Sequence, residues 1–236
     1  MDSVYYFILV PMVYVAFFIF IAGNILQIVK VIQRKRFAPP LKIYPEQKPS
    51  FLWAIYDAFL FPMVRRSNPI LWFFLIGFHV CVFLLFLGHL ELIGDFSVLQ
   101  IIGHEIFIGR GFVGLGILIA LLFFLFRRFA SPVRQFSVPE DYLILMLLLL
   151  TAIFGSQMDW ARTWYGYGEL TVYEYRPYIL SLISLSPDIG PVMDVGHSFM
   201  LVLHVFFANL LLMFFPFSKL VHSIFAVPLN MIRRGK

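Results

Sequence analysis

Histidine is the residue type in this sequence best suited to chemistry, and four of the six histidines form two regularly spaced sets in or beside two apolar stretches. His79 and His89 are ten residues apart, and His204 and His222 are eighteen residues apart. Ionisable side chains are costly inside a membrane, so they are functional candidates there. For any single histidine, a hydrogen bond between helices remains the alternative interpretation. Four histidines in two such segments favour a shared cofactor.

The composition identifies the elements that must position these histidines. Of the 236 residues, 61% are hydrophobic and only 13% are charged, whereas an average soluble domain has about 25% charged residues. This excludes a soluble enzyme, a disordered protein and a secreted disulfide scaffold. A single cysteine, Cys81, excludes an internal disulfide, a four-cysteine zinc site and a cysteine-ligated iron–sulfur cluster.

Five charge-poor runs approach or exceed the length that a membrane span needs. We therefore predict an all-α membrane protein, one integral domain over 1–236, with five transmembrane helices that form a haem-binding bundle. The spans are expected at about 4–29, 69–92, 105–127, 141–158 and 193–217. Segments 49–64 and 177–187 are expected to form short interfacial or re-entrant helices.

The basic residues predict the orientation of the chain. Most of the 18 Lys and Arg residues fall between the first two spans, between the third and fourth, and at the C-terminus. Because basic loops mark the cytoplasmic side, the N-terminus is expected outside and the C-terminus inside. The net charge of +5 is therefore a topology signal and not an indication of nucleic-acid binding.

Antiparallel packing of the second and fifth spans pairs the four histidines by depth. His89 is matched with His204 near the outer face, and His79 with His222 near the inner face. The two spacings correspond to roughly 15 Å and roughly 27 Å of helix, so tilt or a kink at Pro216 must absorb the difference. Eighteen residues are also five turns, which returns His222 to the face of His204.

Two imidazoles that face each other across a helical bundle can supply both axial ligands of a haem. We therefore predict two b-type haems, with the four histidines as the ligands of the haem irons. Zinc is the competing interpretation, but it favours tight clusters with additional Cys or carboxylate ligands. The spacing of these histidines provides no such cluster.

Other candidates lie near the two ends of the third span. His104 and Glu105 are a candidate quinol site, since a quinol needs hydrogen-bond partners and a proton acceptor when it is oxidised; a solvated pair in a loop is the alternative. Arg127 and Arg128 are candidates to neutralise haem propionates, although arginines also anchor spans on the cytoplasmic side. His197 has no assigned role.

Three stretches carry a family resemblance: FHVCVFLLFLGH at 78–89, RRFASPVRQFSVPEDYLILMLLLL at 127–150, and LHVFFANLLLMFFPFSKLVHSIFAVPLNMIRR at 203–234. They resemble the gamma subunit of respiratory nitrate reductases, a family of five-span dihaem cytochromes b. The resemblance covers roughly residues 70–235. Its most specific features are the FPFSKLVH core, the VP that follows it, and the two histidine spacings.

The resemblance implies that His79 and His222 ligate the inner haem, and His89 and His204 the outer one. It implies that (mena)quinol or another quinol is oxidised near the outer face, and that electrons pass through both haems to a cytoplasmic iron–sulfur partner subunit. The implied location is the plasma membrane of a prokaryote, as part of a respiratory oxidoreductase complex.

The chain departs from the nitrate-reductase branch of the family in the connection before the third span. Segment 94–109 has no lysine, and His104, Glu105 and Arg110 occur in this region instead. This difference favours the branch that resembles heterodisulfide reductases and the complexes of sulfate reducers.

Two alternative functions are retained. One is a transporter whose histidines relay protons, and the other is a haem-free membrane anchor of a soluble enzyme. The absence of a repeated half and the few intramembrane carboxylates argue against the transporter. A coloured membrane extract with low-spin b-type bands would separate the cytochrome from both.

Overall fold

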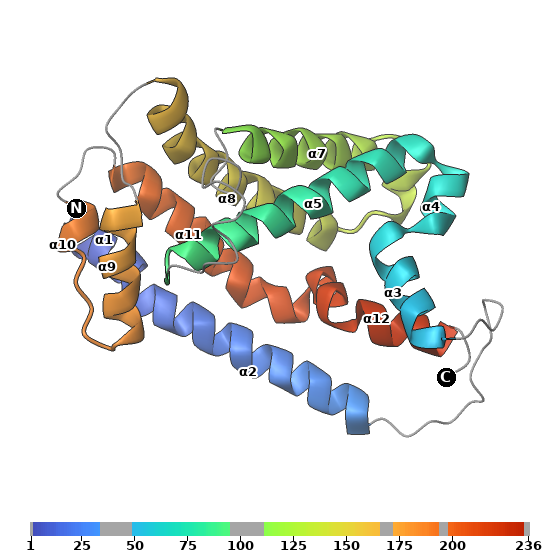
Figure 1. Cartoon of the computed structure of the whole chain (residues 1–236), viewed down its shortest axis with the longest axis horizontal. Helices are drawn as coiled ribbons and strands as arrows, with labels where there is room; N and C mark the ends of the chain where they lie inside the picture. Colours follow the sequence, from blue (N-terminus) through green and yellow to red (C-terminus); the bar gives the residue numbers. More distant parts are fainter. Residues whose placement is uncertain (1, 34–48, 95–110, 166–171, 194–197, 234–236) are drawn as a thin grey trace. The chain divides into compact units, whose positions relative to one another are not determined.

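The chain is helical throughout the part that the structure describes. The computed structural model describes residues 2–33, 49–94, 111–165, 172–193 and 198–233, and every regular element in these ranges is a helix (Figure 1). Five stretches are long and apolar enough to cross a membrane: Asp2–Gln33, Pro69–Glu91, Phe112–Phe129, Pro139–Ala161 and Ser198–Phe217. The predicted all-α class and the five spans are confirmed. Parts of the predicted third and fifth spans, 105–110 and 194–197, lie outside the described residues.

The chain divides into two compact units. One comprises Met1–Phe17 and Gly77–Leu211, and the other Phe18–Ile76 and Leu212–Lys236. Three of the long helices, α2 (Pro11–Gln33), α5 (Pro69–Glu91) and α11 (Ser198–Phe214), contribute to both units. The interpretation of 1–236 as one membrane domain stays a prediction.

In the first unit, the first span is broken between α1 (Asp2–Leu9) and α2. Pro11 has no backbone N–H and its ring disturbs the preceding turn. Nearby carbonyls take side-chain donors: Asn209 Nδ2 donates to Ile8 O at 3.1 Å, and the Tyr178 hydroxyl donates to Leu9 O at 2.6 Å. Burial, with Tyr14 nearby, raises the pKa of Tyr178 above its ordinary value, so its hydroxyl stays a neutral donor.

Around this break lies a buried apolar cluster that joins two short helices to the first span. Tyr178 belongs to α9 (Val172–Ile183), and Val192, which is fully buried, belongs to α10 (Gly190–Met193). These residues pack with Leu9 and with Leu201 of α11. A helix does form over part of segment 177–187, but it begins earlier than predicted, at Val172.

A second cluster in the same unit joins α7 (Phe112–Phe129) to α8 (Pro139–Trp164). Leu121 and Ile117 of α7 are almost fully buried there. Gly114 permits this close approach, because a Cβ at that position would overlap Ser156 Oγ. At the start of α7, Gly111 adopts φ 79°, a left-handed conformation that glycine tolerates. Its backbone N–H donates to Asp159 Oδ2 at 2.9 Å.

In the second unit, the fifth span ends in a break. Helix α11 is followed by two short 3₁₀ turns, η3 (Phe215–Phe217) and η4 (Lys219–Val221), and then by α12 (His222–Arg233). Pro216 is fully buried. A Cβ on Gly23 of α2 would lie 2.6 Å from Pro216 Cγ, and Gln27 Nε2 donates to Pro216 O at 2.9 Å.

The predicted kink at Pro216 is confirmed, but the predicted register of five continuous turns is wrong. His222 begins a separate helix, so helical periodicity no longer relates it to His204. The physical reason is Pro216, which cannot donate to the helical hydrogen-bond ladder.

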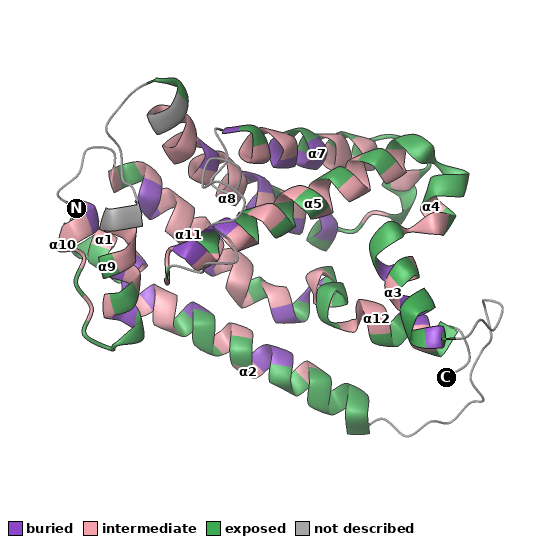
Figure 2. Cartoon of the chain, in the orientation of Figure 1, coloured by how far each residue is buried: buried purple, intermediate pink, exposed green. Residues whose placement is uncertain are grey.

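The predicted helix at 49–64 is present in two pieces, α3 (Ser50–Leu60) and α4 (Pro62–Ser67). Phe61 separates them in a left-handed conformation, with φ 44°, immediately before Pro62. Helix α3 packs against α12 and buries Ala54 completely. Exposed residues recur along the whole of α2 (Figure 2), as expected for a helix that contacts lipid.

Candidate functional site

Two of the predicted ligand histidines face each other within the first unit. His89 lies in the last turn of α5 and His204 in the middle of α11. Their ring centres are 6.4 Å apart and their ring planes are inclined at 34°. The predicted pairing of these two residues therefore corresponds to an observed juxtaposition of their side chains.

Both rings are oriented by hydrogen bonds to backbone carbonyls. Nδ1 of His89 lies 2.8 Å from Leu85 O, and Nδ1 of His204 lies 2.9 Å from Thr151 O. Because a carbonyl only accepts, Nδ1 carries the proton in both rings. Nε2 is then the nitrogen with the free lone pair, which is the arrangement that a metal-ligating histidine shows.

The distance between the ring centres matches the value expected if both Nε2 atoms pointed at one metal ion between the rings. Metal–imidazole bonds are about 2.0–2.1 Å long in zinc sites, and with each ligating nitrogen roughly 1.1 Å from its ring centre, the two centres would be about 6 Å apart. The observed 6.4 Å is close to this value. Two imidazoles on facing helices are a donor set that suits the ligation of a haem iron.

The members of the other predicted pair belong to different units. His79 lies in α5, half-buried, with its ring centre 5.4 Å from that of Phe78. His222 is the exposed first residue of α12, and its Nδ1 donates to Lys219 O at 2.8 Å. This bond also directs the proton to Nδ1. Since His79 and His222 belong to different units, their pairing stays a prediction.

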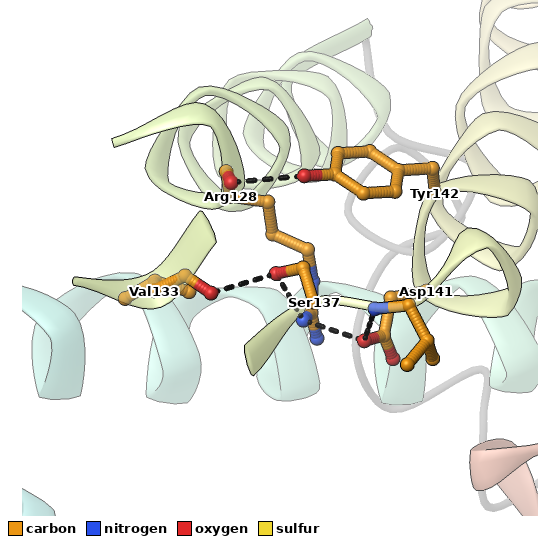
Figure 3. A network of polar contacts seen from close by, with 6 residues as sticks. Arg128, Val133, Ser137, Asp141 and Tyr142 are labelled. Atoms are coloured by element: carbon orange, nitrogen blue, oxygen red, sulfur yellow. Dashed lines mark hydrogen bonds and ion pairs between the residues drawn. The ribbon is translucent and has the colours of Figure 1, made fainter. Parts of the chain in front are cut away.

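Arg128, a candidate partner for a haem propionate, forms an ion pair with Asp141 of the fourth span. Its Nη1 lies 2.9 Å from Asp141 Oδ2 and 3.2 Å from Ser137 Oγ (Figure 3). The same carboxylate oxygen accepts the Val138 N–H at 3.2 Å, and the Tyr142 hydroxyl donates to Arg128 O. Asp141 therefore neutralises Arg128 and caps the start of α8.

The importance of this contact can be tested with Asp141→Ala. The side chain of Asp141 is only 2% exposed, and its loss leaves Arg128 without its counter-charge and the first turn of α8 without its cap. We expect a destabilisation of about 2–3 kcal/mol, measured as a lower Tm in detergent. Glu140→Ala is the matched control, because Glu140 is the adjacent exposed carboxylate. Equal Tm values for the two variants would contradict this role.

Several sequence candidates cannot be placed. His104, Glu105 and His197 lie outside the described residues. Arg127 is half-buried at the end of α7. At the C-terminal end of α5, Arg176 of α9 donates to Glu91 O at 2.7 Å, a contact that links the connection after the fourth span to the helix of His89.

Sequence reasoning missed two contributors to the histidine pair. Thr151 provides the carbonyl that holds His204, and Gly155 lies directly against the His204 ring. No local pattern identifies a backbone acceptor, because every residue has one. The capping role of Asp141 could have been predicted, because an acidic residue in the first turn after a proline is typical of a helix start.

Residues 67–236 match the family model described as nitrate reductase gamma subunit. This chain belongs to that family. The match contains the whole segment of about 70–235 for which the resemblance was noted, and it includes all four of the predicted haem ligands. With five membrane-spanning helices, this member of the gamma subunit family is a multi-pass membrane protein.

Two curated relatives are similar to the chain. Both are described as "Hdr-like menaquinol oxidoreductase cytochrome b-like subunit". The protein from Archaeoglobus fulgidus is 30% identical over 164 residues, which cover 65% of this chain and 47% of the relative. The protein from Archaeoglobus profundus is 25% identical over 267 residues, covering 94% of this chain and 76% of the relative. The chain thus matches about half of the length of the first relative. Their descriptions agree with the expected branch.

Proposed function

We propose that this protein is the cytochrome b subunit of a menaquinol-oxidising respiratory complex. The observation that carries this proposal is the His89–His204 pair, with ring centres 6.4 Å apart and both Nδ1 protons committed to carbonyls. The family match and the descriptions of the two relatives support a quinol as the electron donor.

In this proposal, His89 and His204 hold the outer haem, and His79 and His222 hold the inner one. A haem with two imidazole ligands has no open iron position, so it transfers single electrons and does not bind a substrate. Arg127 is the better candidate for an inner propionate, because Arg128 already pairs with Asp141. Hydrogen bonds to backbone carbonyls orient the rings of His89, His204 and His222. The ring of Phe78 lies beside that of His79.

His104 and Glu105 are proposed to bind the quinol and to accept its protons near the outer face. An imidazole suits this task because its ordinary pKa is close to neutral pH. The chain's own residues include no dinucleotide or iron–sulfur motif. We therefore propose that a cytoplasmic iron–sulfur subunit of the same complex receives the electrons.

The proposal is tested by adding a water-soluble menaquinol analogue to membranes that contain the chain. We expect the absorption bands of reduced, low-spin b-type haem to appear, and to be absent from membranes that lack the chain. A colourless preparation would support the haem-free anchor instead. Proton movement by colourless protein would support the transporter.

The quinol site can be tested with His104→Ala. Loss of a general base typically slows proton transfer about 10²–10⁴-fold, so we expect reduction of the haems by the menaquinol analogue to slow within that range. The haem content should not change. Glu105→Gln tests the second residue of the site in the same assay. Loss of a haem from the His104 variant would instead identify His104 as a ligand.

A further inference from the structure

We infer that α8, which supplies none of the predicted haem ligands, sets the position and the ligand strength of His204 through Thr151 and Gly155. These are positioning residues that act through the imidazole. The inference rests on the proposed outer haem, and it concerns which helix controls that site.

Thr151 and Gly155 form a socket for the His204 ring on one face of α8. The socket has two parts: Thr151 O, which accepts from His204 Nδ1 at 2.9 Å, and the bare Cα of Gly155. A Cβ at position 155 would lie 2.9 Å from His204 Cε1 and 3.0 Å from Nδ1. The ring occupies the space that any other residue at this position would fill.

Helix geometry explains why a glycine stands at this position. Residues four apart are neighbours on a helix face, and each Cβ is tilted toward the N-terminus of the helix. The Cβ of residue 155 would therefore lean over the carbonyl of residue 151. Without a Cβ at position 155, Thr151 O remains accessible to a donor from another helix. The same oxygen is the acceptor of the regular helical hydrogen bond from the Gly155 N–H.

The two rings of the pair are held differently. Nδ1 of His89 donates to Leu85 O, four residues back in its own helix, and the residue is exposed. His204 is half-buried and is bonded across to a different helix. The orientation of the His204 ring therefore depends on the packing of α8 against α11, whereas the observed hydrogen bond of His89 lies within α5.

This difference has a consequence for the iron. A hydrogen bond from Nδ1 makes the opposite nitrogen a stronger electron donor to a metal, and such bonds are one of the means by which proteins adjust haem potentials. A stronger donor favours the oxidised iron. Weakening the bond to Thr151 O should therefore raise the midpoint potential of the outer haem.

The test is Gly155→Ala in the intact chain with its haems. We expect an upward shift in the midpoint potential of one haem, an altered low-spin EPR signal from that haem, and no change in the other haem. Loss of the outer haem alone would also support the inference. Unchanged potentials and EPR signals would contradict it.

A control variant makes this test specific. In Gly116→Ala, the added Cβ would lie 2.9 Å from Cys81 Sγ and not near His204; the outer haem should be unaffected. If Gly155→Ala lost both haems while Gly116→Ala kept both, Gly155 would be a packing residue of the bundle, and the inference would be wrong.

A measurement without haem separates this inference from the proposed function. ¹⁵N NMR of histidine-labelled, haem-free protein reports which ring nitrogen carries the proton. We expect Nδ1–H at His204 in the unsubstituted chain and a changed tautomer ratio in Gly155→Ala. If the chain binds no haem but shows this change, the proposed function fails and the socket remains. If His204 shows the same tautomer ratio in both proteins, the socket is wrong.

Discussion

Replacing His204 by alanine is expected to remove the outer haem and to leave the inner one in place. The variant loses one of the two imidazoles that lie 6.4 Å apart, and a haem with one remaining ligand and no covalent link is held weakly. We expect half of the haem b content of the unsubstituted chain. Because the quinol site is proposed near the outer haem, reduction by a menaquinol analogue should be lost as well.

His89→Ala should give the same result, since His89 is the other member of the pair. Phe199→Ala is the control, because Phe199 lies on the same helix as His204 and its side chain is exposed. We expect that variant to keep both haems. Retention of both haems in His204→Ala, with unchanged redox titrations, would contradict the assignment of this residue as a ligand.

Replacing His222 should have the opposite effect on the two haems. We expect His222→Ala to lose only the inner haem, while the menaquinol analogue still reduces the outer one. Electron transfer to a cytoplasmic partner or a membrane-impermeant acceptor on that side should stop, because the path between the two faces is interrupted. Spectra recorded with and without the acceptor distinguish these steps.

The control for this variant is Ser223→Ala. Ser223 is the next residue, is exposed, and donates only to Leu220 O among the contacts observed for its hydroxyl. It should leave both haems and transfer to the acceptor unchanged. If His222→Ala retained two b-type centres with their original potentials, the pairing of His222 with His79 would be wrong.

The membrane spans and the juxtaposition of His89 with His204 were predictable because both follow from local sequence properties. Length and apolarity set the spans. Antiparallel order then brings His89 and His204 to the same depth, and the structure places their rings together. The break at Pro216 was also predictable, because proline removes a helical donor wherever it occurs.

The remaining features depend on contacts between helices, which the sequence does not display. Tyr178 bonds to Leu9 O, 169 residues away in the sequence, and Asp141 is neutralised by an arginine of the preceding span. His222 was expected five turns along the helix of His204, but two 3₁₀ turns interrupt that helix. The period of one helix cannot be carried across such an interruption.

The central claim is that two haems are each held by a pair of imidazoles. The most direct measurement is the haem b content of the purified chain, combined with a redox titration followed by low-spin EPR. The account predicts two haems b per chain, with two resolved potentials and both irons low-spin. One haem per chain, none, or a high-spin iron with an open position would contradict it.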